Sequence, residues 1–165
     1  MNHKKFETIL IKYNKLKFKG DFDQEPKLLH GVKINLTCDF NERLSTGYYL
    51  PAGTILLLAV DSGTDFNGWS IRIGAHTDDL SNCEKLLRWP CVTSCKSLAR
   101  ELSFSSPFGG LIYFESSGPG SLSVCLNNVI ESPFIDLNKP STIYDWPRRC
   151  QAAGLWVFKK KFKRN

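Results

Sequence analysis

The residues best suited to chemistry lie in one short stretch, RIGAHTDDL at residues 72–80. It places His76, Asp78 and Asp79 within four positions, and imidazole and carboxylate groups are common metal ligands. If the stretch were extended, His76 and Asp78 would share one face and Asp79 would point away. A hard cation would then need further oxygen ligands from elsewhere in the chain.

A structural role explains the same residues without a ligand. Asp78 or Asp79 can form an Asx turn or cap the segment that follows, while His76 forms hydrogen bonds inside the loop. Arg72, on the preceding strand, is more often a surface or loop-pinning charge than an anion receptor. We therefore predict no metal here, and keep these four residues as candidate loop or ligand contacts.

The sequence contains none of the catalytic motifs that we tested. A zinc peptidase of the HExxH type needs two histidines one helical turn apart and a glutamate beside the first. None of His3, His30 and His76 is followed by Glu or has a second His four residues on. No Gly-x-Ser-x-Gly elbow or phosphate-binding loop occurs either. We predict no catalytic residue and no cofactor in this chain.

The six cysteines are scattered along the chain at positions 38, 83, 91, 95, 125 and 150. Three residues separate Cys91 from Cys95, a spacing that differs from the C-x-x-C of redox and zinc sites. We expect free core thiols, with a disulfide framework as the alternative for a secreted protein. No secretion signal is visible, which slightly favours the cytoplasm, and the sequon at Asn35 is interpreted as a chance match.

The composition is that of one globular domain. The chain has 165 residues, 42% of them hydrophobic, and no apolar run is long enough to span a membrane. The net charge of +6 comes largely from lysines near the two ends. Because few aromatic residues are interleaved with those lysines, we expect no nucleic-acid partner. The predicted organisation is a basic segment at 1–30, a domain at 31–157 and a basic tail at 158–165.

Short runs rich in Val, Ile, Thr and aromatic residues predict strands, and Gly- and Pro-containing turns separate them. The predicted strands are 32–40, 54–60, 69–73, 92–104, 111–116, 121–127 and 129–137. We therefore expect a mainly β protein, an antiparallel β-sandwich of jelly-roll or galactose-binding-like type. A short C-terminal helix is predicted after Ser141, and Trp146 and Trp156 are expected to cover one end of the sandwich.

Four motifs give the sequence a family resemblance. They are STGYYLPAG (45–53), RIGAHTDDL (72–80), SPFGGLIYFE (106–115) and SPFIDL (132–137). In this order they resemble the N-terminal β-sandwich region of enhancin-like zinc metallopeptidases. The same block resembles part of the TRP melastatin channel-associated factors.

The resemblance implies a non-catalytic accessory domain, because the zinc-binding helix of those peptidases lies downstream of this region. Zinc is thus expected only in a downstream domain, and the expected partners are an adjacent peptidase-like domain and a glycoprotein. Contacts are expected from loops 61–68, 74–82 and 105–110. The alternative is a cytoplasmic domain that regulates a membrane channel. Whether the whole protein is an enzyme stays open at this point.

Overall fold

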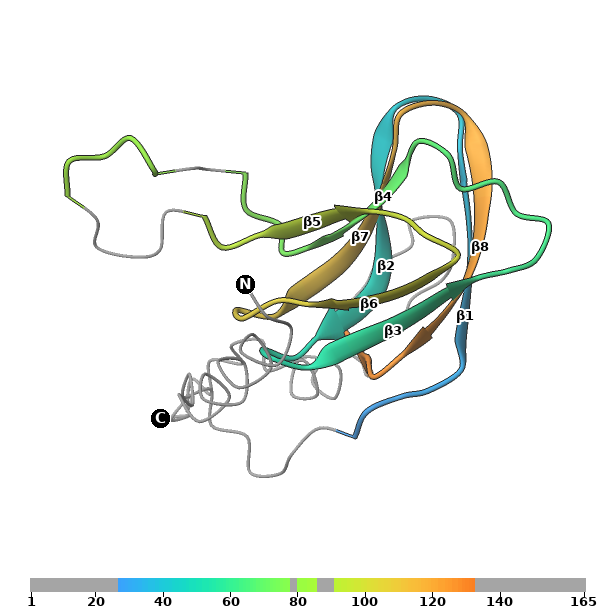
Figure 1. Ribbon diagram of the computed structural model, residues 1–165, viewed down its shortest axis with the longest axis horizontal. Helices are drawn as coiled ribbons and strands as arrows, with labels where there is room; N and C mark the ends of the chain where they lie inside the picture. The colour runs from blue at the N-terminus through green and yellow to red at the C-terminus, as the bar shows by residue number, and fades with distance from the viewer. Residues whose placement is uncertain (1–26, 78–79, 86–90, 133–165) are drawn as a thin grey trace, which may run out of the picture.

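The computed structural model describes residues 27–77, 80–85 and 91–132, which fold into two antiparallel sheets (Figure 1). The strands are β1 (Val32–Cys38), β2 (Glu42–Leu50), β3 (Ile55–Val60), β4 (Trp69–Ile73), β5 (Ser94–Ser97), β6 (Glu101–Ser105), β7 (Gly110–Ser116), β8 (Gly120–Asn127) and β9 (Ile130–Glu131). One sheet has the order β1-β8-β3-β6 and the other β5-β4-β7-β2-β9. These described residues contain no helix long and apolar enough to cross a membrane.

The hydrophobic core lies between the two sheets, and alternation along each strand fills it. In β3 the run ILLLAV is apolar throughout, yet Leu56 and Leu58 are buried whereas Ile55 and Leu57 remain 40% and 45% exposed. The opposite sheet contributes fully buried residues such as Phe114 of β7. Burial of each such side chain stabilises the fold by about 1.5–3 kcal/mol. The predicted antiparallel sandwich is confirmed.

The second strand was not predicted from the sequence, in which residues 45–53 were identified only as a motif. β2 pairs with β7, but the register shifts between Ser45 and Tyr49. Gly47 has a φ of 76°, and the Thr46 hydroxyl donates a hydrogen bond to the Ile112 carbonyl at 2.7 Å. This bulge interrupts the period-two pattern by which a strand is recognised.

The single strand predicted at 92–104 is wrong, because the structure divides it into β5 and β6. β5 pairs with β4 in the five-stranded sheet, whereas β6 pairs with β3 in the other sheet. Between them the Arg100 carbonyl accepts a hydrogen bond from the Val60 amide, and the Arg100 guanidinium donates to the Asp61 carbonyl. These contacts fix the crossover from one sheet to the other.

Several predictions fall wholly or partly outside the described residues. They are the basic segment at 1–30, except for its last four residues, residues 133–137 of the last predicted strand, the C-terminal helix, both tryptophan plugs and the basic tail. The expectation of core thiols holds for Cys38, which is buried, but Cys83, Cys91 and Cys95 are exposed. Cys83 and Cys91 lie between β4 and β5, and Cys95 lies on an edge strand, where a side chain has little protein to cover it.

Candidate functional site

The described parts of the first three motifs meet at one end of the sandwich. β4, β7 and β2 are neighbours in the five-stranded sheet, so the end of β4, the start of β7 and the end of β2 lie side by side (Figure 1). Three loop segments adjoin these strand ends: 50–54 after β2, 74–77 after β4, and 106–110 before β7. We call this group of segments the loop end.

Two glycines allow a close backbone approach within the loop end. A Cβ on Gly110 would lie 2.7 Å from the backbone nitrogen of Gly74 and 2.8 Å from its Cα. The amide of Gly74 also donates a hydrogen bond of 2.9 Å to the carbonyl of Leu111. Since no larger residue leaves room for this contact, the second and third motifs are joined at their glycines.

Ser106 joins the third motif to the first. Its side chain is fully buried, and its carbonyl accepts hydrogen bonds from the amides of Gly53 at 2.9 Å and Gly109 at 3.3 Å. Its hydroxyl accepts a hydrogen bond of 3.4 Å from the amide of Phe108. These bonds satisfy the backbone of two loops at once and hold them in a fixed arrangement.

The fourth motif reaches the same sheet through Ser132. The amide of this buried residue donates a hydrogen bond of 2.9 Å to the carbonyl of Gly47, inside the bulge of β2. Each of the four motifs therefore contacts at least one of the others through main-chain groups. The described motif residues thus have a structural role in packing the loops and strands together.

The structure places only part of the predicted RIGAHTDDL site. His76 is exposed on the loop after β4, whereas Asp78 and Asp79 lie outside the described residues. In the portion of the chain that is described, no group of three His, Cys, Asp or Glu side chains is arranged to hold a metal ion. Of the three predicted contact loops, 74–77 and 105–110 come together. Loop 61–68 lies at the opposite end, where the Ser117 amide donates to the Gly68 carbonyl.

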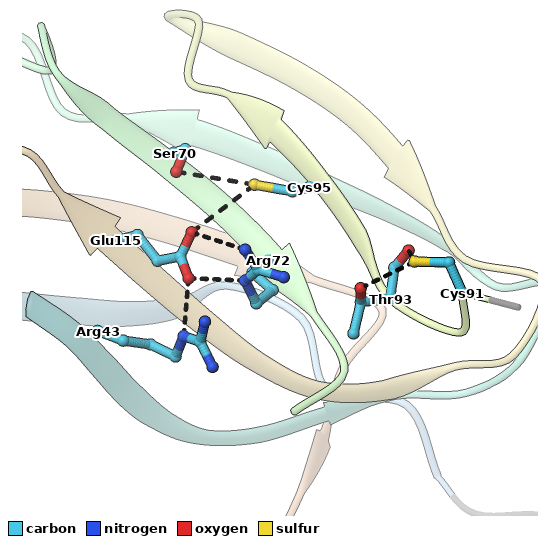
Figure 2. A network of polar contacts seen from close by, with 7 residues as sticks. All are labelled: Arg43, Ser70, Arg72, Cys91, Thr93, Cys95 and Glu115. Atoms are coloured by element: carbon cyan, nitrogen blue, oxygen red, sulfur yellow. Dashed lines mark hydrogen bonds and ion pairs between the residues drawn. The ribbon is translucent and has the colours of Figure 1, made fainter. Parts of the chain in front are cut away.

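Arg72 takes part in an ion-pair network on the outer face of the five-stranded sheet (Figure 2). Its Nε donates to Oε1 of Glu115 at 2.6 Å, and its Nη2 donates to Oε2 at 3.3 Å. Arg43 donates from Nε to the same Oε1 at 2.7 Å. Arg72, interpreted from the sequence as a surface or loop-pinning charge, is thus one of two guanidinium groups on a single carboxylate, and it links β4 to β7.

The strand register aligns the residues of this network, and their neighbours, in two cross-strand rows. Arg43, Glu115, Ser70 and Ser97 are cross-strand neighbours in one row. Ser45, Tyr113, Arg72 and Cys95 form the adjacent row. The Cys95 sulfur lies 3.8 Å from Oε2 of Glu115 and 3.9 Å from the Ser70 hydroxyl. Both contacts are drawn as dashed lines in Figure 2. The result is a sheet face of charged, hydroxyl and aromatic groups.

The two arginines set the charge state of the network. Partial burial acts to raise the pKa of Glu115, but hydrogen bonds and charge interactions with Arg72 and Arg43 outweigh it and lower that pKa. The hydrogen bond to Glu115 in turn raises the pKa of Arg72. Around neutral pH the three groups therefore carry one net positive charge.

We predict that Glu115→Gln weakens the fold in a pH-dependent way. The folded-state pKa lies below the ordinary value of 4.5, so the unfolded chain binds the proton first as the pH falls. The carboxylate therefore contributes stability above about pH 4.5, and this is lost as the pH falls through the folded-state pKa. Urea titrations should show a deficit of about 1–2 kcal/mol at pH 7 that shrinks in acid.

The control for this prediction is Glu101→Gln, which alters an exposed carboxylate on β6. It should change the free energy of unfolding by less than about 0.5 kcal/mol. A deficit for Glu115→Gln that stayed constant from pH 7 to pH 3 would contradict the assigned role of the ion pairs.

The sequence analysis named Arg72 as a candidate loop or ligand contact, but it did not name Arg43, Glu115 or Tyr113. These residues lie on three strands that are distant in the chain, and the strand containing Arg43 was not predicted. The only available signal was polar residues at alternate positions within apolar strands, as in LIYFES. That signal marks a solvent-facing side but does not show which strands become neighbours.

Residues 27–125 match the family described as the N-terminal domain of M60-like peptidases. The chain belongs to this family. The expected resemblance to enhancin-like metallopeptidases is confirmed, as is the interpretation of the chain as their non-catalytic N-terminal domain.

Proteins similar to this chain include the TRPM8 channel-associated factors. The M60-like N-terminal domain is 32% identical over 118 residues to human TRPM8 channel-associated factor 1, covering 68% of this chain and 13% of that protein. It is 35% identical over 132 residues to mouse TRPM8 channel-associated factor 2, covering 76% and 14%. The chain thus spans about one seventh of the length of these relatives.

A solved structure with the same fold is the IMPa metallopeptidase from Pseudomonas aeruginosa. It aligns with a TM-score of 0.56 and 20% identity, covering 81% of this chain and 17% of the metallopeptidase. IMPa has also been solved in complex with an O-glycopeptide, with a TM-score of 0.55 and 17% identity over 79% and 16% of the two chains. At these identities the likeness shows the fold alone.

Proposed function

We propose that this domain packs against a peptidase-like domain of the same protein and orients a glycoprotein substrate for it. The observation that carries the proposal is the loop end, where three motifs of the family are held together by main-chain hydrogen bonds and glycine contacts. A surface that is fixed in this way loses little conformational entropy on docking. Docking through the loop end leaves the outer face of the five-stranded sheet available to substrate.

Two further observations support this assignment. The domain belongs to a family of peptidase N-terminal domains, and it accounts for only about one seventh of its curated relatives' length. The metallopeptidase with the same fold binds an O-glycopeptide in one solved complex. An O-glycosylated, mucin-like protein is therefore the substrate class we propose for the whole protein.

The test compares the domain alone with the domain joined to an M60-like peptidase domain. Alone, it should not cleave O-glycosylated mucin, with or without a chelator. Joined to the peptidase domain, it should lower KM for mucin about threefold or more and leave kcat unchanged, because it adds binding common to ground and transition states. Chelator-sensitive cleavage by the domain alone would overturn the proposal, and so would a KM for mucin that is the same with and without the domain.

A second candidate function is regulation of a membrane channel from the cytoplasm. It is favoured by the 32–35% identity to TRPM8 channel-associated factors, which exceeds the 20% identity to the metallopeptidase. The domain would then bind channel protein directly. Pull-down of purified TRPM8 by this domain, with loss of capture in a loop-end variant, would support this function over the first. An HExxH helix in the downstream sequence would support the peptidase.

A further inference from the structure

On the outer face of the five-stranded sheet, two arginines share a single carboxylate, so the ion-pair network keeps one net positive charge. Arg72 engages Glu115 through two nitrogens, whereas Arg43 uses only Nε. Both terminal Nη groups of Arg43 lack a hydrogen-bond partner among the described residues, and this side chain is 33% exposed. A guanidinium with a free edge can bind a carboxylate or sulfate through two parallel N–H donors.

The fold does not require the second arginine. Ion pairs at this degree of exposure contribute about 0–1 kcal/mol each, and Arg72 alone already compensates the Glu115 carboxylate. The contact with Glu115 does, however, fix the Nε edge of Arg43 and so orients its other edge. A preorganised donor pair of this kind loses less side-chain entropy when it binds an anion.

An aromatic ring and hydroxyl groups surround this charge. The Tyr113 ring centroid lies 5.9 Å from Cζ of Arg43, and Ser45 and Ser70 are cross-strand neighbours of Tyr113 and Glu115. A half-buried tyrosine on a sheet face offers an apolar ring face for sugar C–H groups and a polar edge for sugar hydroxyls. An acidic peptide would use the charge but would not need the ring.

We propose that this surface binds an anionic sugar, with the acidic group on Arg43 and the sugar ring against Tyr113. The ligand class is a carboxylate- or sulfate-bearing sugar of the kind that terminates O-linked glycans. This inference rests on the proposed function, and it adds a substrate contact outside the loop end. Arg72 and Glu115 act as positioning residues for Arg43.

The experiment titrates the chain with four probes by NMR chemical-shift mapping. The probes are 3′-sialyllactose, 3′-sulfated lactose, neutral lactose and an acidic peptide. We expect at least one acidic sugar to bind with a Kd on the order of 1 mM, at least about tenfold tighter than lactose, and more weakly as salt rises. The two acidic sugars distinguish a carboxylate site from a sulfate site.

Four variants locate the site. Arg43→Gln and Tyr113→Ala should each weaken binding of the acidic sugar at least about fivefold. Arg43→Lys should weaken binding less than Arg43→Gln, because lysine keeps the positive charge but lacks the paired guanidinium donors. Lys33→Gln removes an equal charge from an exposed position on β1, in the other sheet, and should change nothing. Melting curves recorded alongside separate lost binding from lost folding.

The proposal is wrong if acidic sugars bind no tighter than lactose, if the acidic peptide binds better than either, or if Lys33→Gln acts like Arg43→Gln. These results are separable from the test of the proposed function. A failed sugar site would leave the KM effect of the domain intact, since that effect can come from the loop end. A failed docking function would leave sugar binding by the isolated chain intact.

Discussion

Gly109→Ala is expected to lower the free energy of unfolding by about 3–5 kcal/mol, the range of severe steric and backbone substitutions. Gly109 has a φ of 65°, where an alanine costs about 1–2 kcal/mol. A Cβ there would also lie 2.6 Å from the carbonyl oxygen of Leu50 and 2.7 Å from the amide nitrogen of Ala52. Both neighbours are backbone atoms, so the loops themselves must separate.

Gly31→Ala is the matched control for this substitution. Gly31 has nearly the same φ, 67°, but a Cβ there would meet nothing within 4 Å. Its cost should therefore be only the backbone penalty of about 1–2 kcal/mol. Urea denaturation of both variants measures the difference, which isolates the close approach in the loop end. Equal losses in the two variants would show that the loops can separate at no cost.

Leu56→Ala should destabilise the chain by about 2–5 kcal/mol, because it removes a fully buried side chain from the centre of the sandwich and leaves a cavity. Leu56 lies on β3 between β8 and β6, where close-packed neighbours on both sides restrict collapse into the space. The midpoint of urea unfolding should fall while the slope of the transition is kept.

The adjacent leucine provides the control. Leu57 is the same residue type in the same strand, but it faces outward and is 45% exposed. Leu57→Ala should therefore cost less than about 1 kcal/mol. Comparable losses at both positions would mean that the outer face of the four-stranded sheet is covered, and the two-layer description would have to be revised.

The loop end also explains what the family motifs encode. Their distinctive residues in the structure are glycines with no room for a Cβ and a buried serine whose carbonyl accepts from two loops. None of these groups is suited to act as a nucleophile, base or metal ligand. RIGAHTDDL suggested metal chemistry on composition alone, but its Gly74 and Arg72 serve loop packing and a strand-linking ion pair. Shared motifs of this kind indicate a common fold more directly than a common reaction.

The sequence by itself determined five of the nine described strands and several of the turns between them. Alternation and β-branched residues identify β1, β3, β4, β7 and β8 to within two residues at each end. In the glycine-containing turns between strands, Gly53, Gly63, Gly68 and Gly109 adopt a positive φ. Both signals are local, since a side chain's face and a residue's φ depend on neighbours along the chain.

Only the tertiary structure decided which strands are neighbours and where the chain changes sheet. β2 was hidden by its bulge, and the step from β5 to β6 depends on contacts made by Arg100 with residues about 40 positions earlier. The Arg43–Glu115–Arg72 network needs three strands in one register, and no pattern along the chain specifies that register. The pairing of strands that are distant in the sequence depends on burying the apolar faces of whole sheets. A pattern within one short segment carries no information about that.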